Sequence, residues 1–483
     1  MAGRGRWPGG CGNGCSATRR SAPSSGNCGR CSSSGSDQEV VVSTAAVEPA
    51  LPPEVRGLPL LGSFLEWRKD QHATFMRAYR EHGPIFTIRL GPMKGVMLIG
   101  PEHHEFFFRE VDRKLSVPEI YRFTVPMFGD LLMAATDTER RRRHVSMLQS
   151  AFQGGRLAAY TEVMAEETER WLTGLGRSGE FELWDTFEPL VMRIAAGALL
   201  GPEIRARIDE FRPLLVDLAR GMEFILPPNL PLPRFRRRDR ARRRLGEMLR
   251  PVLAERARAG GYDDFLQSLV DDAALRAEGP DVQVGMAMAT LFTGYLTTAA
   301  QACWTLVQLL QHPAQLDAVV AEIDADRGGA AAGCPHAGAR LPRLERAFKE
   351  SLRMRPVMSH YARTTAVEYE IGGYRVPEGW LTMLCPSVAH RLPEVFADPE
   401  RYDPDRFGPE RAEDKRNPHA LIGFSGGFYR CPGQAFGTNE TKVLLSGLLA
   451  RYRLDMSVPD PRPDVDLGVT RPGSPCRIRY ERR

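Results

Sequence analysis

This chain has few lysines and no long apolar run. Only six of its 65 basic side chains are lysine, a bias that fits a GC-rich bacterial genome. No apolar stretch reaches the roughly 18 residues that a membrane-spanning helix needs, and the N-terminus lacks the apolar core of a secretory signal. We therefore expect a cytoplasmic protein without integral membrane association.

The chain also lacks a strong excess of charge and an even number of cysteines. The formal net charge is +5, and five arginines against Asp37 and Glu39 place +3 of it in residues 1–46. The remainder is too close to neutral to predict a nucleic-acid partner. Nine cysteines without a secretion signal argue against a disulfide framework.

Residues 1–46 differ in composition from the rest. They are rich in glycine, serine and arginine, so we expect a disordered tail before one folded domain over 47–483. Four cysteines of the tail have a spacing compatible with zinc: Cys11, Cys15, Cys28 and Cys31. We favour a start codon placed too far upstream, because the surrounding residues offer a metal no second shell.

Apolar spacing predicts a mostly helical chain. The longest helical run extends from Asp281 to His312 and ends before Pro313; at 1.5 Å per residue it would be ~48 Å long. Alternation over residues 84–100 predicts a hairpin of short strands. The arginine-rich helix over 234–249 is expected to present a solvated face, with an acidic-lipid surface as the alternative. The fold class is mostly α with small β-sheets (α+β).

One cysteine lies in a glycine-built loop directly before a helix. The loop reads FSGGFYRCPG (424–433), and Gly426, Gly427 and Gly433 let the backbone approach a flat partner closely. A sulfur at a helix N-terminus lies in a positive field that favours the thiolate, which is the axial ligand a haem iron needs for O–O cleavage. An inert buried thiol is the alternative. We predict that Cys431 binds haem iron.

Two further segments hold a candidate charge cluster. Glu350 and Arg353 lie three residues apart on one face of a predicted helix, and alone they would be a solvated pair. Arg406 follows in the segment DPDRF. A carboxylate between two arginines can form a bidentate cluster that pins a long loop.

In this order, before the Cys431 loop, these segments resemble the cytochrome P450 haem-thiolate family. The resemblance starts at PPEVRGLPLLG (52–62) and runs to the C-terminus. It implies a long central helix over the haem, with the cysteine loop beneath. It also implies haem b (iron protoporphyrin IX) with an axial cysteine thiolate, and a structural role for Glu350, Arg353 and Arg406 around the cysteine pocket.

The family's activity follows from the same resemblance. It implies a monooxygenase that inserts one oxygen atom of dioxygen into a C–H bond of a small apolar or moderately polar molecule. The electrons would come from a ferredoxin or flavodoxin with its NAD(P)H-dependent reductase. We expect a monomer.

The middle of the long helix reads FTGYLTT (292–298). In the family, this helix opens over the iron at a glycine, and an acid–threonine pair then organises the water that protonates bound dioxygen. Gly294, Thr297 and Thr298 match and imply catalytic roles for both threonines. Leu296 replaces the acid, so the usual relay is incomplete. Back-bonding of the threonines to their own helix is the alternative.

Within the family, the chain is similar to the bacterial sterol 14α-demethylases at EFFFR (105–109), YRFTVPMFG (121–129), Trp304 and RIRY (477–480). The family pattern implies contacts with the cofactor at Cys431, Tyr121, Arg142, Arg363, Phe424, Gly427, Tyr429 and Gly433. Of these, Tyr121, Arg142 and Arg363 would hold the haem propionates. Substrate contacts are implied at Phe123, Phe128, Tyr295, Leu296, Met358 and His360. The alternatives are a surface charge for Arg142 and plain core packing for the phenylalanines.

The chain also departs from those demethylases. Leu296 stands where they carry histidine, and Ala134 and Ala135 replace an aromatic–acidic pair. Tyr429 replaces the basic residue that usually reaches a propionate. A buried His360 without a partner would cost roughly 2 kcal/mol, so it either meets a polar substrate, which we favour, or turns into a hydrogen bond with the protein.

We therefore expect a terpenoid, steroid-like or other secondary metabolite as substrate. Three alternatives stay open at this point. One is sterol 14α-demethylation, and another is a peroxide-using or non-redox haem-thiolate enzyme. The third is a catalytically silent haem protein that binds a ligand.

Overall fold

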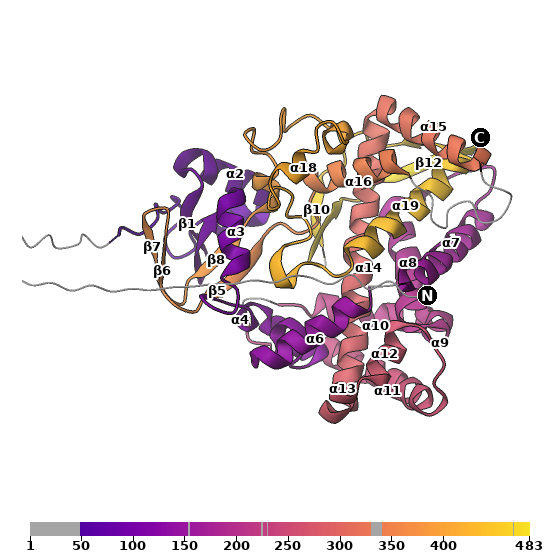
Figure 1. Ribbon diagram of the computed structural model, residues 1–483, viewed down its shortest axis with the longest axis horizontal. Helices are drawn as coiled ribbons and strands as arrows, with labels where there is room; N and C mark the ends of the chain where they lie inside the picture. The colour runs from indigo at the N-terminus through magenta and orange to yellow at the C-terminus, as the bar shows by residue number, and fades with distance from the viewer. Residues whose placement is uncertain (1–48, 153–154, 224–225, 229, 330–340, 467) are drawn as a thin grey trace, which may run out of the picture. The chain divides into compact units, whose positions relative to one another are not determined.

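The longest helix of the chain, α14 (Pro280–Gln311), runs through the middle of the fold (Figure 1). Its 32 residues match the predicted run within one residue at each end. It packs against α8 (Leu183–Ala195), α11 (Pro233–Ala259), α16 (Pro342–Met354) and α19 (Gln434–Arg451). More than two thirds of α14 is buried, because helices cover it on several sides.

The computed structural model describes residues 49–152, 155–223, 226–228, 230–329, 341–466 and 468–483. Residues Glu48–Arg483 form one unit. The predictions for residues 1–46, including the possible zinc ligands, lie outside the described residues. None of the described helices is long and apolar enough to cross a lipid bilayer.

The other helices precede, connect and follow these five. Their bounds are α1 (Phe64–Lys69), α2 (Gln71–His82), α3 (Pro101–Arg109), α4 (Pro118–Tyr121), η1 (Arg122–Thr124), α5 (Val125–Phe128), η2 (Leu132–Ala134), α6 (Thr138–Ser150), α7 (Arg156–Gly174), η3 (Ala196–Leu200), α9 (Pro202–Ala206), α10 (Ile208–Arg220), α12 (Phe265–Asp271), α13 (Ala273–Glu278), α15 (Pro313–Gly329), α17 (Pro386–Ala389), η4 (Pro404–Phe407), α18 (Glu413–Arg416) and η5 (Gly427–Tyr429).

Four small sheets complete the described fold, which confirms the mostly α class with small β-sheets. The largest has the order β1-β2-β8-β5-β3, and the predicted hairpin is its antiparallel pair β1/β2. A second sheet has the order β4-β12-β9, and the other two are the pairs β10/β11 and β6/β7. The bounds are β1 (Ile85–Leu90), β2 (Met93–Leu98), β3 (Leu115–Ser116), β4 (Ser178–Glu182), β5 (Tyr361–Thr365), β6 (Tyr369–Ile371), β7 (Tyr374–Val376), β8 (Leu381–Leu384), β9 (Tyr452–Met456), β10 (Pro463–Asp466), β11 (Val469–Pro472) and β12 (Arg477–Arg482).

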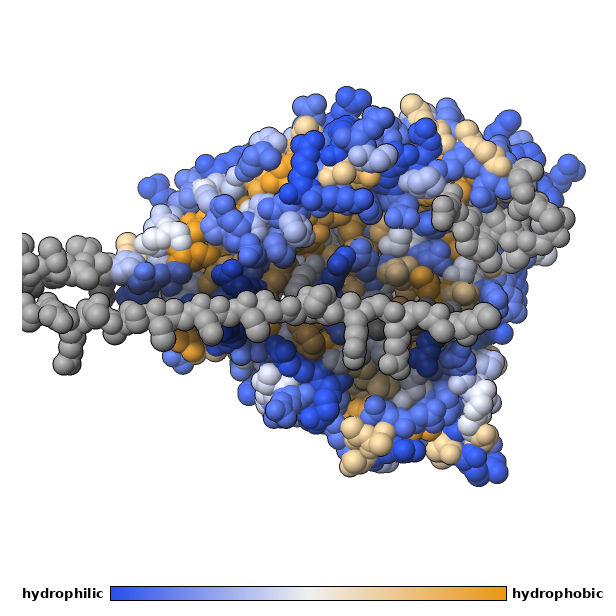
Figure 2. Space-filling model, in the orientation of Figure 1, coloured by the Kyte–Doolittle hydropathy of each residue, from blue (hydrophilic) through white to orange (hydrophobic). Residues whose placement is uncertain are grey.

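Apolar side chains are gathered inside this unit. The largest hydrophobic cluster surrounds α14 and includes Trp304, which is fully buried. The Trp304 indole N–H donates to the carbonyl oxygen of Thr470 at 3.1 Å and thereby ties α14 to β11. Hydrophilic residues dominate the visible face of the folded unit (Figure 2), as the burial of so much apolar surface predicts.

The predicted charge cluster is formed and is completely buried. The Arg353 guanidinium donates to both carboxylate oxygens of Glu350, at 2.7 and 2.9 Å, and Arg406 Nε donates to Oε1 at 3.0 Å. The backbone N–H of Asp403 donates to the same oxygen at 2.8 Å. None of the three charged side chains is exposed. The solvated pair that Glu350 and Arg353 would form alone is therefore ruled out.

A buried histidine connects this cluster to the loop that contains the candidate cysteine. The backbone N–H of Ile422 donates to His390 Nε2 at 3.0 Å, so Nδ1 carries the proton and donates to the Arg353 carbonyl at 3.3 Å. Burial, together with the Arg353 charge, holds the pKa of His390 well below its usual value. The neutral ring is thus a fixed link between α16 and the start of the loop.

We predict that Glu350→Ala destabilises the protein by about 3–5 kcal/mol, because it leaves two buried guanidinium groups without their shared carboxylate. Urea unfolding measures the change. Glu345→Ala on the same helix is the matched control: Glu345 is 43% exposed and pairs with Lys442 at 3.3 Å, so its loss should cost less than about 1 kcal/mol. Equal losses in the two variants would contradict the role assigned to Glu350.

Candidate active site

Cys431 lies between η5 and α19 and is held by the loop that precedes it. Its backbone N–H donates to the carbonyl oxygen of Phe424 at 2.9 Å. The ring of Phe424 stacks on Phe348 of α16, with ring centroids 6.3 Å apart. α19 begins directly after Gly433, as predicted. The loop therefore fixes the cysteine between two long helices.

The thiol of Cys431 is in a recess of the protein. The residue keeps accessible surface, yet its surroundings desolvate the sulfur, and this burial raises the pKa of Cys431. The N–H of Gly433 and the charge of Arg430 act in the opposite direction but are weaker. The helix start therefore favours the thiolate as expected, but in the free side chain burial outweighs it. A bound metal cation would supply the missing positive charge, since coordinated thiols are deprotonated.

Two glycines of the loop lie against α3. A Cβ on Gly426 would lie 2.7 Å from the ring of Phe108, and one on Gly427 would lie 3.0 Å from the Phe108 carbonyl oxygen. Gly427 also has a φ of 63°, which favours glycine. These two glycines therefore admit α3 against the loop, and the close approach of a flat partner stays a prediction. At Gly433 the nearest atoms to an added Cβ include the Cys431 sulfur, at 3.9 Å.

A polar, accessible stripe runs along the middle of α14. It is formed by Thr293, Gly294, Thr297 and Thr298, which keep partial exposure within an otherwise buried stretch. A Cβ on Gly294 would meet only Leu199 within 4 Å, so the helix leaves room at this glycine. The stripe borders the helix that follows Cys431, because a Cβ on Gly437 would lie 3.2 Å from the Thr298 hydroxyl.

Both threonines predicted to be catalytic hydrogen-bond to their own helix. The Thr297 hydroxyl donates to the carbonyl of Thr293 at 3.0 Å, and the Thr298 hydroxyl donates to Gly294 at 2.8 Å. The alternative of back-bonding is thus realised. Each hydroxyl oxygen still has lone pairs with which it can accept a hydrogen bond.

Tyr295 and Leu296 face away from this stripe. Their exposed fractions are 0% and 2%, and both belong to the main hydrophobic cluster. Each step along a helix turns the side chain by about 100°, which separates these two residues from the stripe. Their contact with substrate stays a prediction. Tyr295 packs edge-on against Phe292, and its hydroxyl has no partner among the described residues.

Arg363 is the cofactor-binding candidate whose environment is most specific. Its guanidinium lies 5.3 to 5.9 Å from the rings of Phe107, Tyr121 and Tyr429. The side chain is buried, and its Nε–H has no acceptor among the described residues. A buried, unsatisfied arginine N–H favours an anionic partner, so this position fits the carboxylate of a bound cofactor.

Two neighbouring arginines of α6 take part in a hydrogen-bond network around Asp112 that the sequence did not predict. Asp112 accepts from Arg141 Nη2 at 2.8 Å, from Arg142 Nε at 3.0 Å and from the Tyr429 hydroxyl at 2.8 Å. Arg141 Nε in turn donates to that hydroxyl at 2.9 Å. Tyr429 therefore ties the cysteine loop to α6 and to the bend after α3. The helix period could have indicated that Arg141 is buried, because Arg141 shares a helix face with the buried residues His144 and Val145.

Arg142, which is predicted to bind a propionate, is more exposed to solvent than Arg141. It is 46% exposed, bonds Asp112 and lies over the ring of Phe428 at 4.6 Å. Its two terminal nitrogens have no hydrogen-bond partner in the described part of the chain. Arg142 and Tyr429 both bind Asp112, so they lie on the same side of the loop. The contact of Arg142 with a propionate stays a prediction.

His360 takes the second of its two predicted alternatives. Its Nδ1 is 2.8 Å from the hydroxyl of Ser359, and its ring meets Trp67 and Phe75 edge-on, at 6.1 and 6.3 Å. Burial lowers the pKa of His360 to about 4, so the ring is neutral at pH 7. Met358 is half-buried against the main hydrophobic cluster. Contact of these two residues with substrate stays a prediction.

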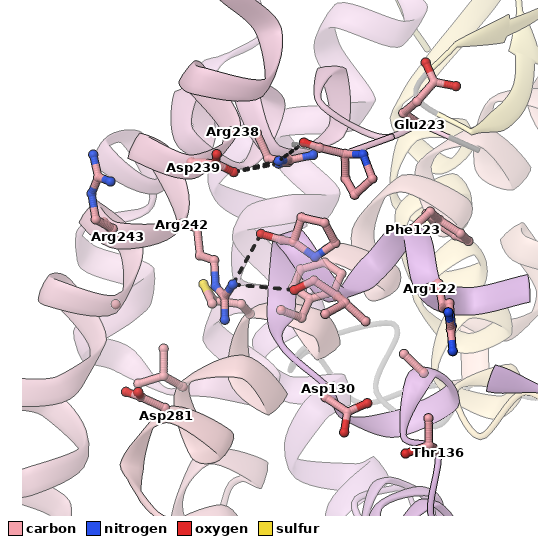
Figure 3. A pocket seen from close by; sticks show the side chains of 18 of the residues that line it. Arg122, Phe123, Asp130, Thr136, Glu223, Arg238, Asp239, Arg242, Arg243 and Asp281 are labelled. Carbon is pink, nitrogen blue, oxygen red and sulfur yellow. Dashed lines mark hydrogen bonds and ion pairs between the residues drawn. The ribbon is translucent and has the colours of Figure 1, made fainter. Parts of the chain in front are cut away.

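Phe123 and Phe128 line a cavity of about 1020 Å³ (Figure 3). The cavity lies between the segment from α4 to η2, helix α11 and the first half of α14. Phe123 also stacks on Tyr121, with centroids 6.1 Å apart, and Phe128 packs on Phe292 at 5.4 Å. Tyr121 in turn lies beneath Arg363, so this cavity borders the candidate cofactor site.

Comparison with known proteins agrees with this arrangement. The cytochrome P450 family model matches residues 52–479. The sterol 14α-demethylase of Mycobacterium tuberculosis is 31% identical over 446 residues, which cover 90% of this chain and 98% of that protein. The cyclooctat-9-en-7-ol 5-monooxygenase of Streptomyces melanosporofaciens is 30% identical over 420 residues, with 82% and 88% covered. The solved structure of retinoic acid-bound cyanobacterial CYP120A1 has a TM-score of 0.81 at 23% identity, over 90% of this chain and 100% of that chain.

The fold and the cysteine loop before α19 define a haem-thiolate class of protein, and the chain belongs to the cytochrome P450 family. It is an oxidoreductase of the monooxygenase type, with resemblance to sterol 14α-demethylases. The family implies a haem with a cysteine ligand, and Cys431 stays the predicted ligand. Small-molecule substrates and redox partners are equally features of this family.

We predict that Tyr429→Phe weakens haem retention. The change leaves the buried Arg141 Nε without its acceptor, at a cost of about 1–3 kcal/mol, and removes a tether of the Cys431 loop. Haem transfer to apomyoglobin measures the dissociation rate, which we expect to rise at least fivefold. Tyr374→Phe, a half-buried tyrosine on β7, is the control; a similar rise there would remove the special role of Tyr429.

Proposed function

We propose that this enzyme binds haem b through Cys431 and hydroxylates a terpenoid or steroid-like molecule. The observation that carries this proposal is the place of Cys431, an accessible residue on the loop that precedes α19, the helix that borders the polar stripe of α14. Bound haem supplies the reductive activation of dioxygen, which side chains alone cannot perform. The protein's share is to hold the cofactor, place the substrate and manage protons.

Groups on both sides of the Cys431 loop would hold the cofactor. The unsatisfied Nε–H of Arg363 and the hydroxyl of Tyr121 would hold one propionate. Arg142 would hold the other from the α6 side. The network of Asp112, Arg141 and Tyr429 keeps the loop in place between them.

Proton management rests on Thr297. Its hydroxyl donates to its own helix, so its lone pairs accept a hydrogen bond from a water or from a proton-bearing substrate group. Leu296 lies in the core and carries no proton. Water held at the accessible stripe beside Gly294 therefore replaces the side-chain acid of the family pattern. A ferredoxin or flavodoxin with its NAD(P)H-dependent reductase would supply the electrons.

The substrate class is supported by two kinds of relatives. Proteins named as sterol demethylases and a monooxygenase named for cyclooctat-9-en-7-ol are about equally identical to this chain. Phe123 and Phe128 offer an apolar lining of the kind that such molecules need. We favour a terpenoid or steroid-like substrate over the sterol 14α-methyl group, because Leu296, Ala134 and Ala135 depart from the demethylase pattern.

Sterol 14α-demethylation is the second candidate. The observation in its favour is 31% identity over almost the whole length of the mycobacterial sterol 14α-demethylase. Incubation with lanosterol and a surrogate redox system tests it. Release of formate together with a demethylated sterol would establish this activity, whereas binding without turnover would leave the terpenoid assignment as the better one.

We predict that Cys431→Ser abolishes the red-shifted Soret band of the reduced carbon monoxide complex, because a serine cannot supply the thiolate. The difference spectrum of the dithionite-reduced protein is the measurement. Cys385→Ser is the matched control: Cys385 is buried, burial raises its pKa to about 11, and it should leave the band unchanged. Persistence of the band in Cys431→Ser would refute the proposed ligand.

We predict that Thr297→Ala increases peroxide release at the expense of product, because a group that takes part in proton transfer is lost. Hydrogen peroxide and NADPH are measured in the same reaction. Thr305→Ala on the same helix is the control, since Thr305 is fully buried and bonded to the Gln301 carbonyl. Unchanged coupling in Thr297→Ala would remove this residue from the mechanism.

A further inference from the structure

The cavity between α11 and the segment from α4 to η2 has an apolar floor. Phe123 and Phe128 come from one wall, and Val284 and Met288 come from α14. Its volume of about 1020 Å³ is at the upper end for a small-molecule site and is large enough for an apolar body of about twenty carbons. The floor alone would suit any uncharged lipid.

The rim of the cavity is different, since charged side chains surround it (Figure 3). Most of its carboxylates are already engaged by arginines. Asp130 pairs with Arg140 at 3.1 Å, and Asp281 pairs with Arg250 at 2.7 Å. Two more pairs complete this set: Asp239 with Arg238, and Glu223 with Arg234.

Three rim arginines have no carboxylate partner among the described residues. They are Arg122 of η1 and two residues of α11, Arg242 and Arg243. Arg242 reaches only the backbone carbonyls of Val125 and Pro126, each at 3.5 Å, which is the limit of a hydrogen bond. Glu119 is the one rim carboxylate without an arginine.

Two of these arginines, Arg122 and Arg242, come from different elements of the rim. Arg242 points into the cavity from α11, and Arg122 lies on the opposite side of the opening, beside Phe123 (Figure 3). The floor beneath the rim is apolar. Arginine forks bind carboxylates through paired, charge-assisted hydrogen bonds that strengthen where water is partly excluded.

We infer that this cavity recognises the carboxylate of an amphipathic organic acid, with Arg122 and Arg242 on the acid group and the apolar body on Phe123, Phe128 and Met288. The inference deepens the proposed function, because the acid would be the substrate, and a terpenoid acid is its expected class. The cavity borders the cofactor site through the stack of Phe123 on Tyr121. An acid group at the rim would therefore set which end of the molecule points inward.

The test compares a diterpene acid with its uncharged derivatives. Abietic acid, methyl abietate and abietinol are titrated into the haem-loaded protein at low salt, with the Soret shift and isothermal calorimetry as parallel readouts. The acid should bind about tenfold or more tightly than the ester, as expected for charge-assisted hydrogen bonds, and added salt should reduce the difference. Equal affinities for acid and ester would overturn the inference.

Substitutions locate the effect. Arg242→Gln and Arg122→Gln should each remove most of the preference for the acid while leaving the affinity for the ester unchanged. Arg244→Gln is the matched control on α11, because Arg244 is 60% exposed, pairs with Glu247 and lies outside the cavity. A preference that survives in the Arg122 and Arg242 double variant, or that Arg244→Gln removes equally, would refute the site.

The outcome is separable from the fate of the proposed function. Calorimetry reports binding of the acid whether or not Cys431 ligates haem, whereas the carbon monoxide spectrum reports ligation without any substrate. A normal spectrum with equal binding of acid and ester would overturn only the carboxylate site. An abnormal spectrum with a retained, arginine-dependent preference would overturn only the ligation.

Discussion

The buried carboxylate of Glu350 is the interaction on which the rest of the site depends. Two guanidinium groups and one backbone N–H converge on it without any exposure to solvent. Such a cluster tolerates little displacement, because loss of the Glu350 carboxylate would leave the buried charge of Arg353 without its partner. Through the neutral ring of His390, the same cluster holds the start of the Cys431 loop. The position of the thiol therefore depends on the buried cluster around Glu350, which does not contact the thiol directly.

Helix α14 divides its faces between packing and chemistry. Tyr295 and Leu296 pack in the core. Gly294 and Thr297, which flank them in the sequence, belong to the polar, accessible stripe. The alternation follows from the helical turn of about 100° per residue. An acid at position 296 would thus project from a different face of the helix than Thr297. Leucine at this position therefore changes the packing of the buried face and leaves the accessible stripe as it is.

Sequence patterns predicted much of this arrangement, with particular failures. The long helix, the first hairpin and the cluster of Glu350, Arg353 and Arg406 were found from spacing and family resemblance, because those signals are local or carried by motif order. Arg141 was missed, because the run of four arginines was not compared with the helix period that places Arg141 on the face of Val145. The larger effect of burial on the pKa of the Cys431 thiol was not predicted, because desolvation depends on neighbours distant in the chain.

What the sequence alone determined is the class: a cysteine in a glycine-rich loop before a helix, a charge pair on an earlier helix and a long helix with a central glycine. Those features are local, and each follows from backbone geometry or charge spacing. Only the tertiary structure decided which side chains face which. The pairing of Asp112 with Tyr429, the turn of His360 toward Ser359 and the unpaired arginines at the cavity rim join residues remote in sequence. Such contacts depend on how the helices pack, which no local pattern encodes.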